Sequence, residues 1–144
     1  TEGANSGIKY FVTEDEKTSG SAIGLEYQIL DDFNHPDAKL GNHPGSRTLA
    51  SLYDLIKAGN KRRNGVGMWN NVRIVSDGMH VEHWLNGFKV LEYERGSEEF
   101  RQLVEESKYA KWENFGEAEE GHLLLQDHGD RVSFRSIKLL KLNE

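Results

Sequence analysis

Residues 80–93 read His80-Val81-Glu82-His83-Trp84-Leu85-Asn86-Gly87-Phe88-Lys89-Val90-Leu91-Glu92-Tyr93, two apolar-rich runs separated by Asn-Gly. This dipeptide tolerates positive φ at both central positions of a type I′ turn, which joins antiparallel strands. We therefore predict a β-hairpin. A two-residue turn sets the expected cross-strand pairs, which are Leu85 with Phe88, His83 with Val90, Val81 with Glu92, Trp84 with Lys89, and Glu82 with Leu91.

Short apolar runs on both sides of this hairpin predict further strands. We expect them at 8–12, 24–30, 48–56, 68–75, 122–126 and 132–142, with 121–142 forming a second hairpin. Segment 48–56 is also compatible with a short helix. A helix is expected over 97–107, because Ser97 suits an N-cap and Phe100, Leu103 and Val104 form an apolar stripe.

The composition fits one domain built mainly from strands. The 144 residues include 15 glycines and 36% hydrophobic side chains, which is typical of a chain with many turns. About seven strands and one short helix predict an all-β, antiparallel β-sandwich or jelly roll over residues 1–144. Ligands of such folds commonly bind on a concave face, at strand positions that point away from the core.

Charge and residue usage exclude several classes of protein. The net charge of −6 argues against a nucleic-acid partner, and we interpret the short basic run 61–63 as a solvated loop. Without cysteine there can be no disulfide, thiolate metal site or thiol nucleophile. No apolar stretch reaches the roughly 20 residues of a membrane span.

Several motifs, in order, carry a resemblance to a known family, and residues 121–142 carry it most clearly. The motifs are Asn5-Ser6-Gly7-Ile8, Gly24-Leu25-Glu26-Tyr27-Gln28-Ile29-Leu30-Asp31-Asp32, His83-Trp84-Leu85-Asn86-Gly87, and Gly121-His122-Leu123-Leu124-Leu125-Gln126-Asp127-His128-Gly129 followed by Val132-Ser133-Phe134-Arg135. With them the chain resembles the 3-keto-disaccharide hydrolase family over nearly its whole length. That resemblance implies a concanavalin A-like sandwich and a bacterial, extracytoplasmic protein, whether periplasmic, secreted or surface-anchored.

Members of that family usually begin with additional strands upstream of the first motif. The resemblance therefore predicts an N-terminally incomplete domain. A missing sandwich strand would leave open sheet edges, so we expect the absent segment, or another chain, to complete the sandwich.

The chemistry implied by the family is cleavage of a glycoside whose C3 is a ketone. The ketone acidifies the C2 proton, a base removes that proton, and the enolate expels the C1 substituent before water adds. This route needs a base near pKa 7, an acid for the leaving group and a cation for the enolate oxygen. A conventional glycosidase would instead need two carboxylates.

Three residues are candidates for these catalytic roles. Glu26 lies on the polar face of its strand, where a sugar site is expected. His128 belongs to the Gln-Asp-His-Gly motif that marks the family, although it could be an ordinary turn histidine. Arg135 is in phase with Ile137 and Leu139, so it could point inward to a ligand or to a structural salt bridge.

Further residues are candidates for binding. Substrate-binding candidates are Asn5, Ser6, Gln28, Tyr53 and Gln126. Asp31, Asp32 and His35 could bind a divalent metal ion, but turn capping by Asp explains them equally well.

We interpret Trp69 and Trp84 as core residues. His80 and His83 superficially suggest zinc, yet on a strand they point to opposite faces.

The main hypothesis is therefore a glycosidase acting on 3-keto-glycosides. The alternative is a carbohydrate-binding, lectin-like module without catalysis, because the same fold serves both. A domain that mediates contacts within a larger envelope protein is also compatible with the sequence.

Overall fold

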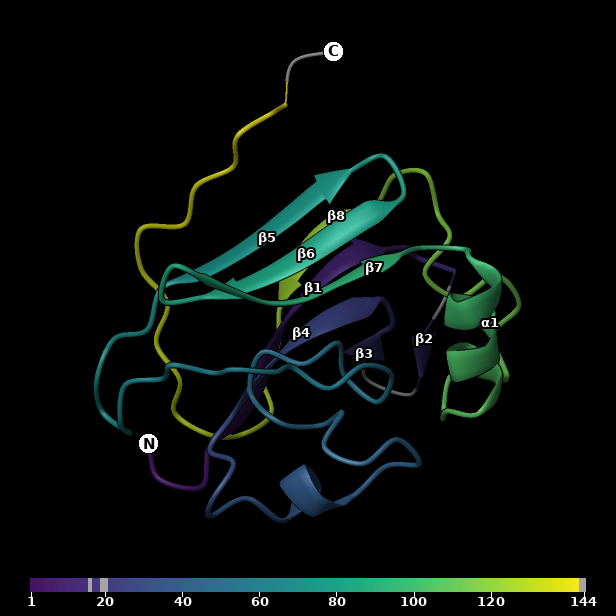
Figure 1. The fold of residues 1–144 in the computed structure, drawn as a ribbon. Helices are drawn as coiled ribbons and strands as arrows, with labels where there is room; N and C mark the ends of the chain where they lie inside the picture. The colour runs from purple at the N-terminus through teal and green to yellow at the C-terminus, as the bar shows by residue number, and fades with distance from the viewer. Residues whose placement is uncertain (16, 19–20, 143–144) are drawn as a thin grey trace.

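Two antiparallel three-stranded sheets face each other in the computed structural model (Figure 1), which describes residues 1–15, 17–18 and 21–142. One sheet has the order β4 (Leu25–Leu30), β1 (Asn5–Val12), β8 (His122–Leu125). The other has the order β5 (Val72–Asp77), β6 (His80–Leu85), β7 (Phe88–Glu94). The smaller elements are β2 (Lys17–Thr18), β3 (Ser21–Ala22), the 3₁₀ helix η1 (Pro36–Lys39) and the helix α1 (Glu98–Glu105).

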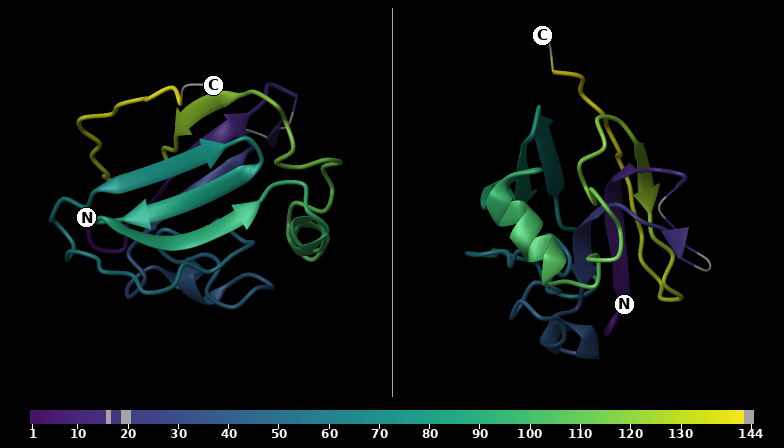
Figure 2. Two further views of the ribbon diagram at one scale, coloured as in Figure 1. Left: turned by 45° about the horizontal axis from the view of Figure 1, so that its top comes forward. Right: turned by 90° about the vertical axis from the view of Figure 1, so that its right-hand side faces the viewer.

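The core lies between the two sheets. Leu25 and Tyr27 of β4 and Val81 and Leu85 of β6 are each at most 1% exposed and belong to one apolar cluster. Alternation along each strand sends these side chains inward and their neighbours outward. The predicted antiparallel β-sandwich is confirmed, and Figure 2 shows the two layers from other sides.

The β6–β7 hairpin forms as predicted, with φ of 50° at Asn86 and 84° at Gly87. Leu85 pairs with Phe88, as expected. Beyond Trp84 the predicted register is wrong, because a bulge shifts the pairing by one residue. The observed pairs are Val81 with Tyr93, Glu82 with Glu92, and His83 with Leu91. In this register, buried residues of both strands pair with each other on the core side of the sheet.

The predicted helix is confirmed as α1. The Ser97 side chain caps it by accepting a hydrogen bond from the Phe100 backbone N–H at 3.1 Å, and two glutamates occupy the first turn, where they complement the helix dipole. Phe100 and Val104 are buried against the core. The helix thus closes one end of the sandwich.

Segment 48–56 is not a strand, so that prediction is wrong. Ala50 and Asp54 have φ of 67° and 65°, and such left-handed conformations interrupt an extended path. The segment instead runs as turns beside the free edge of β4, where the Ala50 N–H donates to the Gln28 carbonyl at 2.8 Å and the Tyr53 N–H donates to the Glu26 carbonyl at 2.9 Å. This edge is therefore covered by irregular backbone.

The predicted C-terminal hairpin is also wrong in its second half. Within the described residues, 132–142 contain no strand, and Leu139 and Leu140 are 84% and 83% exposed. The segment extends away from the sheets (Figure 1). Apolar residues alternate along this segment, but it does not pair with any described strand. Alternation alone does not make a strand, because a strand needs backbone hydrogen bonds to a neighbour. The predicted strand 68–75 begins later, at Val72.

None of the helices among the described residues is long and apolar enough to cross a membrane.

Candidate functional site

A cleft of about 330 Å³ opens on the side of the β4-β1-β8 sheet that faces away from the core. Neighbouring positions on β1 and β4 that alternate with the core residues project there, among them Lys9 and Glu26, which are cross-strand partners. The lining residues are Asn5, Lys9, Ile23, Gly24, Glu26, Tyr53, Lys108, Tyr109, Lys111, Trp112, Gln126, Asp127 and His128. Five residues proposed from the sequence thus converge from four separate segments, namely Asn5, Glu26, Tyr53, Gln126 and His128.

Glu26 forms part of the cleft wall and is only 4% exposed. Burial raises the pKa of its carboxyl from 4.5 to about 7, although the ammonium groups of Lys9 and Lys108 act to lower it. Desolvation outweighs both attractions because the carboxyl sits deep among β1 and β4. A carboxyl with a pKa near neutrality can accept a proton at physiological pH, as a general base must.

Hydrogen bonds hold the floor of the cleft together. The Ser6 hydroxyl donates to the Gln126 carbonyl at 2.8 Å, and the Gln126 N–H donates to the Gly7 carbonyl at 2.9 Å. With its amide nitrogen turned inward, Gln28 donates to the Ser6 carbonyl at 2.9 Å and to Glu26 Oε1 at 3.3 Å. Ser6 and Gln28 therefore support the cleft from beneath and are absent from its lining.

The side-chain amide oxygen of Gln126 lies beside the cleft in an unusual environment. Among the described residues, its Oε1 is buried without a hydrogen-bond partner. Buried acceptors are nearly always paired, so an oxygen left unpaired beside a cleft is suited to accept from a ligand hydroxyl. His128 is exposed at the cleft rim, in a turn where the Asp127 side chain accepts from the Gly129 N–H at 2.9 Å.

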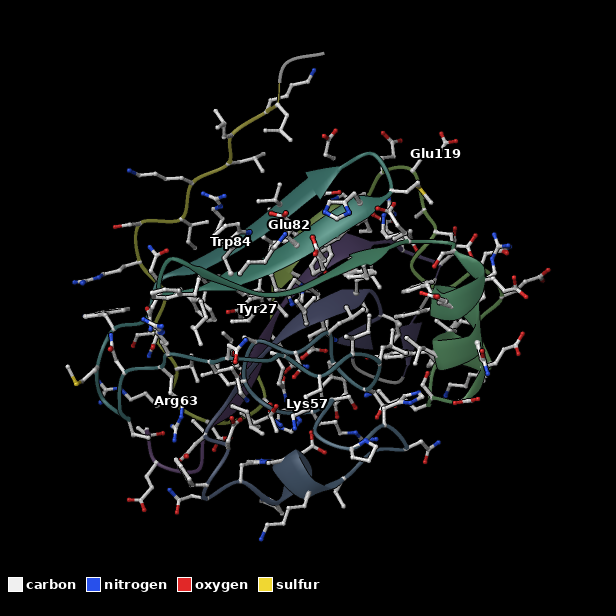
Figure 3. The ribbon with its side chains drawn as sticks, in the orientation of Figure 1. Tyr27, Lys57, Arg63, Glu82, Trp84 and Glu119 are labelled. Carbon is white, nitrogen blue, oxygen red and sulfur yellow. The ribbon has the colours of Figure 1, made fainter. Side chains whose placement is uncertain are left out.

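Arg135 does not line the cleft. Its guanidinium lies 4.0 Å from the centroid of the Trp69 ring, and both residues are exposed. The inward orientation expected from strand phase is wrong, because no strand forms there. Trp69 and Trp84 are not core residues either, since Trp69 is 46% exposed and Trp84 lies on the outward face of β6 (Figure 3).

The three residues proposed for a metal site are engaged within the protein. Asp31 accepts from the Gly3 N–H at 2.9 Å, which is the largest cause of the lowered pKa of that carboxyl. Asp32 accepts from the Lys61 ammonium at 2.6 Å, and His35 Nδ1 accepts from a backbone N–H in the first turn of η1. Asp31 and His35 thus cap local turns, whereas Asp32 forms an ion pair with a distant lysine.

A different group of possible ligands converges in the described part of the chain. It comprises His80, Glu82 and Glu92 on the outward face of the second sheet. The Lys89 ammonium lies 3.1 Å from Glu82 and 2.6 Å from Glu92, so these carboxylates already have a cation. His83, by contrast, is fully buried, as the opposite-face argument predicts.

Sequence reasoning missed the basic side of the cleft. Lys108, Tyr109 and Lys111 follow α1 and reach the cleft beside Trp112. Their alternation of basic and aromatic residues, Lys-Tyr-Ala-Lys-Trp, was the available signal. Lys9 lies in a predicted strand, but the sequence does not show that Glu26 is its neighbour. The pairing of β1 with β4 places the two residues opposite each other.

The fold and the cleft define a β-sandwich protein with a polar, aromatic-rimmed site that suits a small-molecule ligand. The chain belongs to the family described as the 3-keto-alpha-glucoside-1,2-lyase-like domain, which matches residues 1–140. It is 37% identical, over 162 aligned residues, to a protein of Bacteroides thetaiotaomicron named 3-keto-disaccharide hydrolase. That alignment covers 99% of this chain and 56% of the relative, so the chain spans little more than half of the relative's length.

Two crystal structures from Parabacteroides distasonis, each described as a "putative glycosyl hydrolase", are also similar. The first has a TM-score of 0.71 and 29% identity, and the match covers 87% of this chain and 59% of the other. The second has a TM-score of 0.52 and 29% identity, covering 65% and 46%. The resemblance drawn from the sequence motifs is thereby confirmed.

Proposed function

We propose that this chain cleaves glycosides that carry a ketone at C3, by elimination, with Glu26 as the base. The observation that carries the proposal is the buried Glu26 carboxyl in the cleft wall, flanked by Lys9 and Lys108 and with a pKa raised to about 7. The family and the relative named 3-keto-disaccharide hydrolase support the choice of substrate.

The proposed reaction begins with removal of the C2 proton by the Glu26 carboxylate. The C–H electron pair forms an enolate with the C3 carbonyl, and the enolate re-forms the ketone as a C1–C2 double bond appears and the C1–O bond breaks. The departing oxygen takes a proton, for which His128 at the rim is the proposed donor. Water then adds across the double bond and yields the 3-keto sugar.

Other residues of the cleft are proposed to hold the sugar. The unpaired Oε1 of Gln126 accepts from a hydroxyl, and Asn5 offers an amide beside it. The partly exposed Trp112 ring provides a surface on which a pyranose ring can stack. These contacts would equally serve a binding module without catalysis, which is the alternative function.

A substrate comparison tests the proposal. Purified protein is incubated with an aryl 3-keto-glucoside and with its unoxidised parent, each with and without chelator, and aryl release and the unsaturated intermediate are followed by NMR. We expect release from the keto substrate only. Release from the parent alone would favour a conventional glycosidase, and sugar binding without release would favour the binding module.

Matched variants connect the activity to Glu26. Glu26→Gln keeps the size of the side chain but removes the base, so cleavage should fall by about 10²–10⁴-fold. Glu105→Gln, on the exposed face of α1, makes the same chemical change outside the cleft and should retain activity. Equal activity of the two variants would exclude Glu26 as the base.

A further inference from the structure

Lys108 presents an ammonium group to the cleft without a hydrogen-bond acceptor among the described residues. Its Nζ lies 4.2 Å from the centroid of the Tyr53 ring and 5.1 Å from that of the Tyr109 ring. The faces of these rings attract the charge but accept no conventional hydrogen bond. An ammonium has three donors, and those of the exposed Lys108 side chain are therefore open to solvent or to a ligand in the cleft.

The position of Lys108 is fixed by a partly buried network of hydrogen bonds and ion pairs. Its backbone N–H donates to Asp54 Oδ2 at 3.0 Å, and Asp54 Oδ1 accepts from Arg47 Nε at 2.6 Å. The same guanidinium binds Asp37 at 2.8 Å, and Asp37 accepts from the Tyr53 hydroxyl at 2.9 Å. The aromatic ring beneath the ammonium and the backbone that carries it are thus held by one set of ion pairs, which limits the reorganisation needed to bind a ligand.

The other lysines of the cleft are less suited to a reacting oxygen. Lys9 is 4% exposed and donates to the Ala22 carbonyl at 3.0 Å. The Lys111 ammonium lies over the Trp112 ring at 4.2 Å and is part of the rim. Lys108 alone among the three combines an ammonium with open donors and an electrostatic interaction with Glu26. Partial burial lowers the pKa of Lys108, although the Glu26 carboxyl acts to raise it.

We propose that Lys108 is a catalytic residue that donates a hydrogen bond to the C3 ketone oxygen and stabilises the enolate formed when Glu26 removes the C2 proton. This inference rests on the proposed function. It gives to Lys108, in place of Arg135, the role of the cation at the enolate oxygen. No bond forms between protein and sugar in this step. The electron pair released from C2–H moves to the oxygen, and the Lys108 N–H bonds stay intact.

Proton exchange separates enolisation from cleavage. The probe is the 3-keto derivative of 1,5-anhydroglucitol, which lacks a leaving group at C1, and replacement of its C2 proton by deuterium is followed by NMR in D₂O. Lys108→Met should slow the enzymatic exchange by about 10²–10³-fold, the usual effect of removing one oxyanion donor, while the Kd of the probe changes much less. Lys57→Met, an exposed lysine outside the cleft lining, should exchange like the wild type.

Lys108→Arg provides a rescue and a pH readout. Arginine keeps the charge and does not titrate below pH 12, so exchange should recover at least tenfold over Lys108→Met, and loss of activity at alkaline pH should begin at a higher pH than in the wild type. Thermal unfolding of each variant shows that the fold is retained. A purely structural role would lower the unfolding temperature without moving the pH profile.

Each contrary outcome has a distinct meaning. Exchange by Lys108→Met within threefold of the wild type overturns the role of Lys108 while leaving the proposed function intact. A borohydride-trapped adduct of the probe on Lys108 overturns the non-covalent role. If the wild type neither exchanges the probe nor cleaves keto-glycosides, the proposed function fails, and the inference fails with it.

Discussion

The carboxyl group of Glu26 fills the space above the Cα atom of Gly7 on the adjacent strand. A Cβ atom at Gly7 would meet Glu26 Oε1 and lie 2.7 Å from its Cδ. Gly7 has an ordinary backbone conformation, so its lack of a side chain is required by this close approach and not by φ. The glycine thereby lets a carboxyl lie buried against the sheet.

Gly7→Ala should therefore impair activity more than stability. The Glu26 side chain must move to accommodate the methyl group, and displacement of a reacting group by about 1 Å can cost on the order of 10²-fold in rate. Overpacking of this kind costs about 1–3 kcal/mol of unfolding free energy. The measurements are kcat/KM on the keto substrate and the free energy of unfolding in urea.

Gly65→Ala is the matched control, because a Cβ there meets nothing within 4 Å and the backbone conformation is ordinary. It should leave both quantities unchanged. Wild-type kcat/KM in Gly7→Ala would show that the observed position of Glu26 does not matter for the reaction.

Local chemistry made part of this structure predictable. The Asn86-Gly87 turn and the Ser97 cap are encoded by neighbours in sequence, and both elements form where expected. Ala50 and Asp54 adopt positive φ although neither is glycine. The Ala50 N–H donates to the Gln28 carbonyl of β4, and the Asp54 carboxylate accepts from Arg47 and from the Lys108 N–H. No local sequence pattern predicts these contacts.

The residues of the candidate site likewise include some that the sequence could predict and one that it could not. Glu26 could be proposed from strand alternation and His128 from a family motif. Lys108 could not, because its relation to Glu26 is created by packing of the segment after α1 against the β4-β1-β8 sheet. The phase that directs Arg135 inward requires a strand over 132–142, and none forms there.

Glu26 also makes the stability of the protein depend on pH. Its pKa is higher in the folded state, so its contribution is fully present below pH 4.5 and is lost as the pH rises to about 7. Glu26→Gln removes this loss. The variant should unfold like the wild type near pH 4.5 and be more stable by about 3 kcal/mol at pH 8.

Urea unfolding at both pH values measures this difference, with Glu105→Gln as the control for an exposed glutamate. A constant difference between Glu26→Gln and the wild type across the range would mean that Glu26 titrates normally in the folded protein. The gain in stability should accompany the loss of activity.

His83 gives the opposite pH dependence. It is fully buried between the sheets, where Tyr10 and the Ala50 carbonyl lie 2.6 and 2.9 Å from its ring nitrogens. Burial lowers its pKa to about 4, although the bond to Ala50 acts to raise it. The stability due to neutral His83 is therefore fully present above pH 6.5 and is lost as the pH falls towards 4.

His83→Gln should be less stable than the wild type by about 1–3 kcal/mol at pH 8, because the buried Tyr10 hydroxyl and Ala50 carbonyl lose the imidazole as their hydrogen-bond partner. That gap should narrow as the pH falls from 6.5 to 4, since the variant has no imidazole to protonate. His122→Gln, at an exposed position on β8, should show no such narrowing. A gap that stays constant with pH would mean that His83 can be protonated without unfolding.

Arg135 provides the last test, because sequence and structure assign it different roles. Its guanidinium lies on the exposed Trp69 ring, and an exposed cation–π contact contributes about 0.5–1 kcal/mol. Arg135→Ala should therefore keep kcat/KM within about threefold of the wild type. It should lower the free energy of unfolding by no more than about 1 kcal/mol. His128→Ala, at the rim of the cleft, should lower kcat/KM by about 10²-fold if its imidazole protonates the leaving oxygen. A hundredfold loss in Arg135→Ala would mean that the segment after His128 moves when substrate binds and brings the guanidinium into the cleft, and the role assigned to Lys108 would then be shared.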